Sequence, residues 1–208
     1  MTTKLPSESS AQPLLRRERA ARPQRRRFSR DEYYRMAELG LFRGERVELI
    51  NGEIVEKSPQ GLNHGDAIVL LTRLLTLALG RDFAVRVQLP LSLGRKTEPE
   101  PDVAVLRGTG LATEGKHPST ADLVIEVAES SLAYDRTTKA TLYAKAGIPE
   151  YWVINLVNRQ LEVRRDPRLL QGSKSKHAYA QTTLYAAGDT VSPLCAPELQ
   201  LAVSEMLP

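Results

Sequence analysis

The sequence predicts one α/β or α+β domain, in which helices flank a central mixed β-sheet. Its segments alternate in type along the chain, from a helix and a hairpin to a second helix, successive strands, a third helix and more strands. Two of the strands are apolar at almost every position, which is typical of the buried centre of a sheet. A chain of 208 residues is also long enough to bury a core of its own.

A helix of about three turns opens the predicted domain, and a hairpin follows it. Ser29 and Glu32 have the spacing of a capping box, and Gly40 supplies a left-handed stop. Residues 46–57 then form a hairpin around Asn51-Gly52, because this dipeptide best tolerates the two positive φ angles of a type I′ turn. Both elements are therefore predicted from local signals alone.

The next segment, residues 63–79, repeats apolar side chains at helical spacing, so we expect a well-buried helix that ends at Gly80. The later elements follow from similar signals. In order they are strands at residues 83–93, 101–106 and 123–128, a helix capped by Ser130 or Ser131 and running to Ala146, a strand at 151–154, and a C-terminal β extension that pairs 160–164 with 177–185.

The first 27 residues are not expected to join this domain, because they are rich in Ser, Pro, Ala and Arg and have no apolar period. They carry eight basic and two acidic residues, a formal charge of +6, whereas residues 28–208 are near −2. We expect a disordered, arginine-rich tail at 1–27 and the folded domain at 28–208. The tail either contacts nucleic-acid phosphates or is a solvated leader, and the sequence favours neither.

The composition argues against a disulfide-bonded, zinc-binding or membrane-spanning protein. Cys195 is the only cysteine and cannot form an internal disulfide, and no Cys and His set has zinc-ligand spacing, which favours a reduced, cytoplasmic setting. No apolar run reaches the roughly 18 to 20 residues of a membrane helix, and no signal peptide is evident. We therefore expect a soluble protein without a membrane segment.

Asp102 is the first candidate for chemistry, because this carboxylate opens the strongly apolar strand at residues 101–106. A carboxylate at the edge of a buried strand loses its hydration unless it is paired or binds a metal ion. The alternative is that Asp102 caps the first turn of the strand in solvent.

Glu126 is the second candidate, since it interrupts the apolar strand at residues 123–128. Glutamate is almost never buried there without a partner. If this strand lies beside that of Asp102, the two carboxylates project into one pocket and form a plausible Mg²⁺ site. A buried salt bridge would also explain Glu126.

The helix after this strand carries the third feature. Asp135, Lys139 and Tyr143 stand at i, i+4 and i+8, so a regular helix would place them in one stripe near Glu126. Taken alone, Lys139 would be expected to form an exposed ion pair with Asp135, which contributes only about 0.3 to 0.5 kcal/mol.

These motifs together resemble the Uma-type branch of restriction-endonuclease-like proteins in the PD-(D/E)xK nuclease superfamily. The usual superfamily pattern places a lysine two residues after the acid on the same strand, where this chain has Ala128. The branch takes that lysine from the following helix, and Lys139 is the matching position. The similarity runs from about Phe28 to Val163, and its motifs are Glu48-Leu49-Ile50-Asn51-Gly52-Glu53, His64, Pro101-Asp102, Glu126, Asp135 to Lys139, Tyr143 and Gly147-Ile148-Pro149-Glu150-Tyr151-Trp152.

The resemblance implies a restriction-endonuclease-like core and a metal-dependent endonuclease that hydrolyses phosphodiester bonds in DNA. Asp102, Glu126 and the main-chain carbonyl of Val127 would hold Mg²⁺ or Mn²⁺, which would activate a water molecule and polarise the scissile phosphate. Lys139 would orient that water or offset phosphate charge. Asp102, Glu126 and Lys139 are thus the predicted catalytic residues.

Four further residues are expected to support this site. Glu48 ligates a second metal ion or anchors the first through water, unless it forms a surface ion pair across the hairpin. His64 contacts phosphate, unless it only bonds to backbone at a helix start. Asp135 and Tyr143 are expected to position Lys139.

Two other functions stay open from the sequence. One is a catalytically inactive nuclease-fold module that binds nucleic acid or a protein partner, and the other is a structural ion-pair network of the acidic pair with Lys139 or Arg136. A homodimer is also expected, because cleavage of both strands of a duplex needs two sites, with apolar residues 151–156 and 184–203 as the interface.

Overall fold

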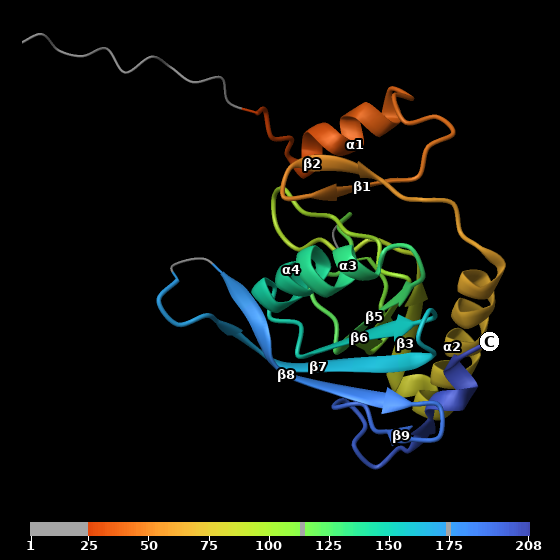
Figure 1. Cartoon of the computed structure of the whole chain (residues 1–208). Helices are drawn as coiled ribbons and strands as arrows, with labels where there is room; N and C mark the ends of the chain where they lie inside the picture. Colours follow the sequence, from red (N-terminus) through yellow and green to blue (C-terminus); the bar gives the residue numbers. More distant parts are fainter. Residues whose placement is uncertain (1–24, 113–114, 174–175) are drawn as a thin grey trace, which may run out of the picture.

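The computed structural model describes residues 25–112, 115–173 and 176–208. A six-stranded mixed sheet forms the centre, in the order β3-β4-β5-β6-β7-β8, and the predicted fold class is confirmed (Figure 1). Only the pair β5–β6 is parallel within this sheet, and the helical segment between these strands makes the crossover that a parallel pair requires.

The helices and strands follow one another along the chain with these bounds: α1 Arg30–Glu38, β1 Val47–Ile50, β2 Glu53–Glu56, α2 Leu62–Leu79, β3 Phe83–Val87, β4 Val103–Arg107, β5 Leu123–Ala128, α3 Leu132–Tyr134, a π-helical turn Asp135–Lys139, α4 Ala140–Lys145, β6 Glu150–Asn155, β7 Gln160–Leu169, β8 His177–Ala186, β9 Thr190–Val191 and β10 Leu201–Ala202. Short 3₁₀ turns occupy Gly80–Asp82 and Val203–Met206.

The sheet separates two apolar cores. Side chains alternate between the faces of a strand, so Ile125 and Val127 of β5 pack against α2, whereas Val124 packs with α4 on the opposite face. Figure 1 shows α2 on one side of the sheet, and α3 and α4 on the other with the β1–β2 hairpin and α1 beyond them. Glu126 therefore points toward α3 and α4 from the centre of the sheet.

Both predicted elements at the start of the domain are confirmed. Ser29 and Glu32 form a capping box at α1, and Gly40 has a φ of 76° just after it. Asn51 and Gly52 have φ angles of 51° and 82°, which close the β1–β2 hairpin as a two-residue turn with both angles positive.

Two strands are shorter than predicted. β3 ends at Val87 instead of residue 93, because Gln88 adopts a φ of 50° and Pro90 has no N–H for a ladder. β4 begins at Val103, after Pro101. At the C-terminal end, β7 and β8 pair over more residues than predicted and continue the central sheet.

The helix predicted up to Ala146 is interrupted. Residues Asp135–Lys139 form a π-helical turn between α3 and α4, which no residue pattern indicated. Ser131 lies at the N-cap position, but its hydroxyl donates to Asp135 Oδ2 at 2.5 Å instead of capping the helix. The prediction of a regular, serine-capped helix is therefore wrong at its N-terminal half.

Two further expectations, about a dimer interface and about membrane helices, are also corrected. All residues of β6 are buried inside the sheet, so residues 151–155 of the predicted stretch 151–156 do not provide the dimer interface that we expected from it. One helix of the described residues, Leu62–Asp82, is long and apolar enough to cross a membrane by length and composition, contrary to expectation. The core helix of a soluble protein can have the same length and composition. In this helix the face with Ala67, Leu71 and Leu75 is buried against the sheet.

The predicted tail falls mostly outside the described residues, which begin at Arg25. The arginines that are described contact the start of the domain. Arg27 donates to the Asn51 carbonyl at 3.0 Å and lies 3.0 Å from Glu53, and Arg26 pairs with Glu32 at 2.5 Å.

Candidate active site

A cavity of about 400 Å³ opens between the β1–β2 hairpin, the first turn of α2, the end of β5 and the π-helical turn. β4 runs antiparallel to β5, so the start of β4 lies beside the end of β5, and this brings Asp102 to Glu126. The predicted site residues that line the cavity are Glu48, His64, Asp102, Glu126, Val127, Asp135 and Lys139.

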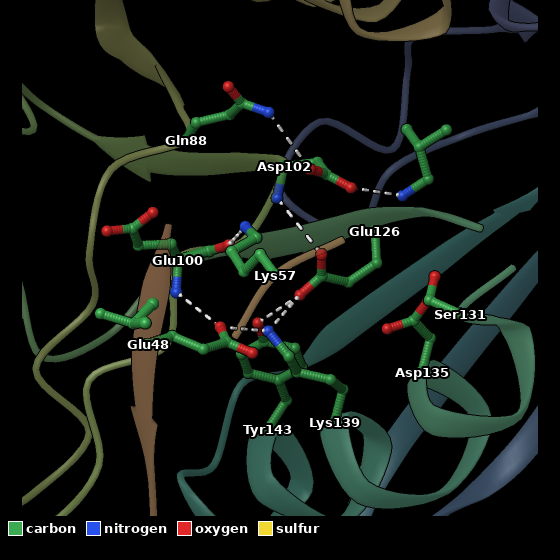
Figure 2. Close-up of polar contacts among 12 residues, drawn as sticks. Glu48, Lys57, Gln88, Glu100, Asp102, Glu126, Ser131, Asp135, Lys139 and Tyr143 are labelled. Atoms are coloured by element: carbon green, nitrogen blue, oxygen red, sulfur yellow. Dashed lines mark hydrogen bonds and ion pairs between the residues drawn. The ribbon is translucent and has the colours of Figure 1, made fainter. Parts of the chain in front are cut away.

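Asp102 and Glu126 are joined through the main chain at this junction (Figure 2). The Val127 amide donates to Asp102 Oδ2 at 2.9 Å, and the Asp102 amide donates to Glu126 Oε2 at 3.3 Å. Both residues are 4% exposed. Asp102 is therefore not a capping residue in solvent, and the two carboxylates share one cavity.

Lys139 joins this pair to a third carboxylate. Its Nζ lies 3.2 Å from Glu126 Oε1 and 2.7 Å from Glu48 Oε2, and Tyr143 donates its hydroxyl to Glu126 Oε1 at 2.6 Å. In the described residues no salt bridge joins Lys139 to Asp135. The alternative of an exposed pair with Asp135 is wrong, because Lys139 is buried and faces the sheet.

Glu48 reaches the site because β1 attaches to the segment before Asp102. Leu49 and Glu98 exchange backbone hydrogen bonds of 3.3 and 2.7 Å, and the Glu100 amide donates to Glu48 Oε2 at 3.1 Å. Glu48 is only 2% exposed, so the alternative of a surface ion pair across the hairpin is wrong.

The π-helical turn sets the direction of Lys139. A π turn has i→i+5 hydrogen bonds and widens the helix, and such turns occur often at functional sites. It separates Asp135, which accepts from Ser131, from Lys139 and Tyr143, which both contact Glu126. The predicted stripe of three residues is thus split, since Lys139 and Tyr143 contact Glu126, whereas Asp135 lines the cavity and bonds to Ser131.

His64 lies in the first turn of α2 with its Nε2 3.3 Å from Asp102 Oδ1. Burial acts to lower the pKa of this imidazole, but the neighbouring Asp102 and Glu126 outweigh burial and raise it. His64 is therefore placed by a carboxylate of the site.

Comparison with known proteins shows the family of this chain. Residues 30–204 match the Uma2 family, which is described as "Putative restriction endonuclease". The chain belongs to the Uma2 family. No match was found among curated proteins.

The Uma2 chain is also similar to a solved structure, described as a putative nuclease belonging to DUF820 from Anabaena variabilis. The two share 20% sequence identity with a TM-score of 0.60, over 78% of this chain and 89% of that one. At this identity the likeness concerns the fold, and it confirms the restriction-endonuclease-like architecture.

Negative charge is in surplus at the Uma2 site, because six acidic side chains line the cavity, three of them the buried Glu48, Asp102 and Glu126, against the two lysines Lys57 and Lys139 and the exposed Arg46 at its rim. Burial raises the pKa of Glu126 to about 7 although Lys139 opposes this. Burial acts to lower the pKa of Lys139, but Glu126 and Glu48 outweigh it, so the pKa is raised and the side chain stays protonated. Burial acts to raise the pKa of Asp102, yet His64 and the Val127 amide lower it overall.

The donors present fit a small divalent cation. Within the described ranges no group of three or more His, Cys, Asp or Glu side chains could hold a metal ion, so a protein-only cage of that kind is absent. The carbonyl of Val127 adds a third oxygen, because the N–H and C=O of one strand residue point to the same edge and its N–H meets Asp102. Two carboxylates, one carbonyl and remaining water positions suit Mg²⁺ or Mn²⁺, and the surplus negative charge favours it.

Sequence reasoning missed two parts of the site. Glu100 contributes its backbone, which donates to Glu48 and accepts from Lys57 Nζ at 2.7 Å. Lys57 lines the cavity directly, yet its position after a hairpin and before Ser58-Pro59 is typical of a solvated turn. Only the contact between β1 and the segment before Asp102, which is remote in sequence, places both residues here.

Proposed function

We propose that this Uma2 protein is a metal-dependent endonuclease that hydrolyses phosphodiester bonds in DNA. The observation that carries the proposal is the pair of carboxylates Asp102 and Glu126 in one cavity, with the ammonium of Lys139 3.2 Å from Glu126. Membership of a family described as "Putative restriction endonuclease" supports nuclease chemistry.

Asp102, Glu126 and the Val127 carbonyl would hold the Mg²⁺ or Mn²⁺ ion. When bound, the ion supplies a water of lowered pKa and polarises the phosphate. Lys139 stays protonated between Glu48 and Glu126, so it acts as a hydrogen-bond donor and as a positive charge near the phosphate, not as a general base. Tyr143 holds the Glu126 carboxylate in place through its hydroxyl.

One observation favours a different function. Glu48, Glu126 and Lys139 pair with one another without a metal ion, as a buried structural network would. The competing function is a catalytically inactive nuclease-fold module that binds nucleic acid or a protein partner. It predicts that DNA is bound but never cut.

Nicking of supercoiled plasmid DNA tests the proposal. The wild type should nick the plasmid with Mg²⁺ or Mn²⁺ and stop when EDTA is added, whereas Asp102→Asn should lose about 10³-fold in rate, several kcal/mol of transition-state stabilisation. Glu129→Gln is the matched control, because this exposed carboxyl lines the same cavity outside the pair and its loss should be silent. Wild-type protein that binds the plasmid without nicking it would support the inactive module.

A further inference from the structure

The rim of the cavity carries two cations that the mechanism does not use. Arg46 and Lys57 both line it, at the open end of the β1–β2 hairpin. The Lys57 amide donates to the Arg46 carbonyl at 2.7 Å, so the two residues face each other across the hairpin. This continues the strand register beyond Val47 and Glu56 and fixes where both side chains start.

Lys57 has an unusual set of partners for a lysine in an acidic cavity. Six acidic side chains line the cavity, yet across the described ranges Lys57 forms no salt bridge with any of them. Its Nζ donates instead to the carbonyl of Glu100 at 2.7 Å (Figure 2). An ammonium has three donors, so two of them are available to a ligand.

The other lysine of the cavity is held very differently. Lys139 is buried between Glu48 and Glu126, which take two of its three donors and already balance its charge. Lys57 is half-buried and has one neutral acceptor. A phosphate oxygen can therefore engage Lys57 without breaking an ion pair.

Arg46 adds a second charge at the same rim. It is exposed, and among the residues that the structure describes its guanidinium has neither a salt bridge nor a side-chain hydrogen bond. A guanidinium offers a planar fork of donors that matches phosphate oxygens. The cavity thus has carboxylates at its floor and two available cations at its hairpin rim.

We propose that Lys57, assisted by Arg46, forms a subsite for a backbone phosphate of the nucleic acid next to the one that is cleaved. The inference rests on the proposed function, because the carboxylate floor must receive the scissile phosphate for the rim to receive its neighbour. Contacts of this kind displace counterions and position the strand without reading its sequence. Lys57 is therefore a substrate-binding residue that acts on affinity.

Three variants test the subsite in steady-state plasmid cleavage. Lys57→Met keeps the length of the side chain and removes its charge, Lys57→Arg keeps the charge, and Lys145→Met removes an exposed lysine on α4 outside the cavity. We expect Lys57→Met to raise KM about tenfold with kcat within about twofold of wild type, while Lys57→Arg and Lys145→Met stay near wild type.

Fluorescence anisotropy of a short labelled DNA duplex gives an independent readout. In the Asp102→Asn background, which removes cleavage, adding Lys57→Met should lower the slope of log affinity against log salt by about 1, the loss of one phosphate contact. Lys57→Met that leaves both KM and the salt slope unchanged, or that lowers kcat alone, would overturn the subsite while the nuclease stands. A wild type that neither cuts nor binds DNA would overturn the proposed function, and the subsite with it.

Discussion

Two buried glutamates of the central sheet meet opposite electrostatic surroundings. Glu126 of β5 and Glu162 of β7 are 4% and 2% exposed, and each pairs with a cation of the same π-helical turn, Lys139 or Arg136. Arg136 Nε donates to Glu162 Oε1 at 2.8 Å, and Arg164 contacts the other oxygen at 3.2 Å.

The balance of charge differs between the two clusters. Around Glu162 the cations outnumber the carboxylate, and although burial acts to raise the pKa of Glu162, hydrogen bonds from the two arginines lower it. Around Glu126 the buried carboxylates Glu48, Asp102 and Glu126 outnumber the lysines Lys139 and Lys57, and burial raises the pKa of Glu126 to about 7. Burial of a carboxylate therefore does not by itself mark a functional site. A surplus of buried negative charge does, because a bound cation would relieve it.

The largest difference in the free energy of unfolding between the two clusters is expected when each loses its cation on the π-helical turn. Lys139→Met leaves Glu48 and Glu126 buried without a counter-charge, which should cost about 3 to 5 kcal/mol in the free energy of unfolding. Arg136→Met should cost about 1 kcal/mol, because Glu162 keeps Arg164 and the Arg136 side chain is 39% exposed. Urea unfolding measures both, and equal losses would contradict the comparison.

The same substitution at the two glutamates should change the stability of the protein in opposite directions. Glu126→Gln removes a charge that the fold disfavours and should stabilise the metal-free protein by about 1 to 3 kcal/mol at pH 8. Glu162→Gln leaves two arginines short of a carboxylate and should destabilise it by about 2 kcal/mol.

Melting temperatures in EDTA at pH 8 show directly whether each of these two variants is more or less stable than the wild type. If Glu126→Gln melts below the wild type, the charge surplus at the site is not real, and Glu126 behaves as Glu162 does.

The affinity of the Glu126 cluster for a metal ion should depend on pH. The ordinary pKa of 4.5 for Glu126 is raised to about 7 in the folded protein, so folding takes up a proton and the metal-free protein gains stability as the pH falls from about 7 toward 4.5. A cation must displace that proton. Mg²⁺ or Mn²⁺ affinity should therefore fall by up to about tenfold per pH unit below 7 and level off above it.

Titration calorimetry in buffers of different ionisation enthalpy counts the released proton. A pH-independent affinity between 6 and about 8 would mean that Glu126 is already ionised, or that it is not a ligand.

The smallest expected effect is that of Tyr143→Phe, which removes one neutral donor from Glu126. The variant should lose about 1 kcal/mol of stability and raise the pKa of Glu126 further, because the ionised form loses a hydrogen bond. Tyr179→Phe is a control of the same type, since its hydroxyl donates to the Ile148 carbonyl away from the site. A shift of the metal-binding pH profile in Tyr143→Phe alone would support the assignment.

Local signals predicted the elements whose geometry depends on a few neighbouring residues. The capping box of α1 and the Asn51-Gly52 turn are of this kind, and both formed as expected. The apolar runs around Asp102 and Glu126 also indicated central strands, but that the two strands are adjacent was only a condition of the predicted site, and the pairing of β4 with β5 meets it.

Contacts remote in sequence decided the rest of the site. Glu48 meets Lys139 across 91 residues, and nothing within either segment reports that approach. The spacing of a regular α-helix, 3.6 residues per turn, predicted Asp135 and Lys139 on one stripe. The π-helical turn at Asp135–Lys139 has a different spacing, so that prediction does not hold there. Glu162, between Leu161 and Val163, carries the same signal as Glu126 and could have been found in the same way.

Metal binding is the most direct test of the central claim, that Asp102 and Glu126 together hold a divalent cation. Mn²⁺ should be titrated into wild type, Asp102→Asn and Glu162→Gln by isothermal calorimetry at pH 8, with the melting temperature of each recorded. We predict one Mn²⁺ per wild-type chain, no binding to an Asp102→Asn protein that stays folded, and unchanged binding to Glu162→Gln if it remains folded. Wild-type protein that binds no Mn²⁺, or Asp102→Asn protein that binds it as tightly, would contradict the account.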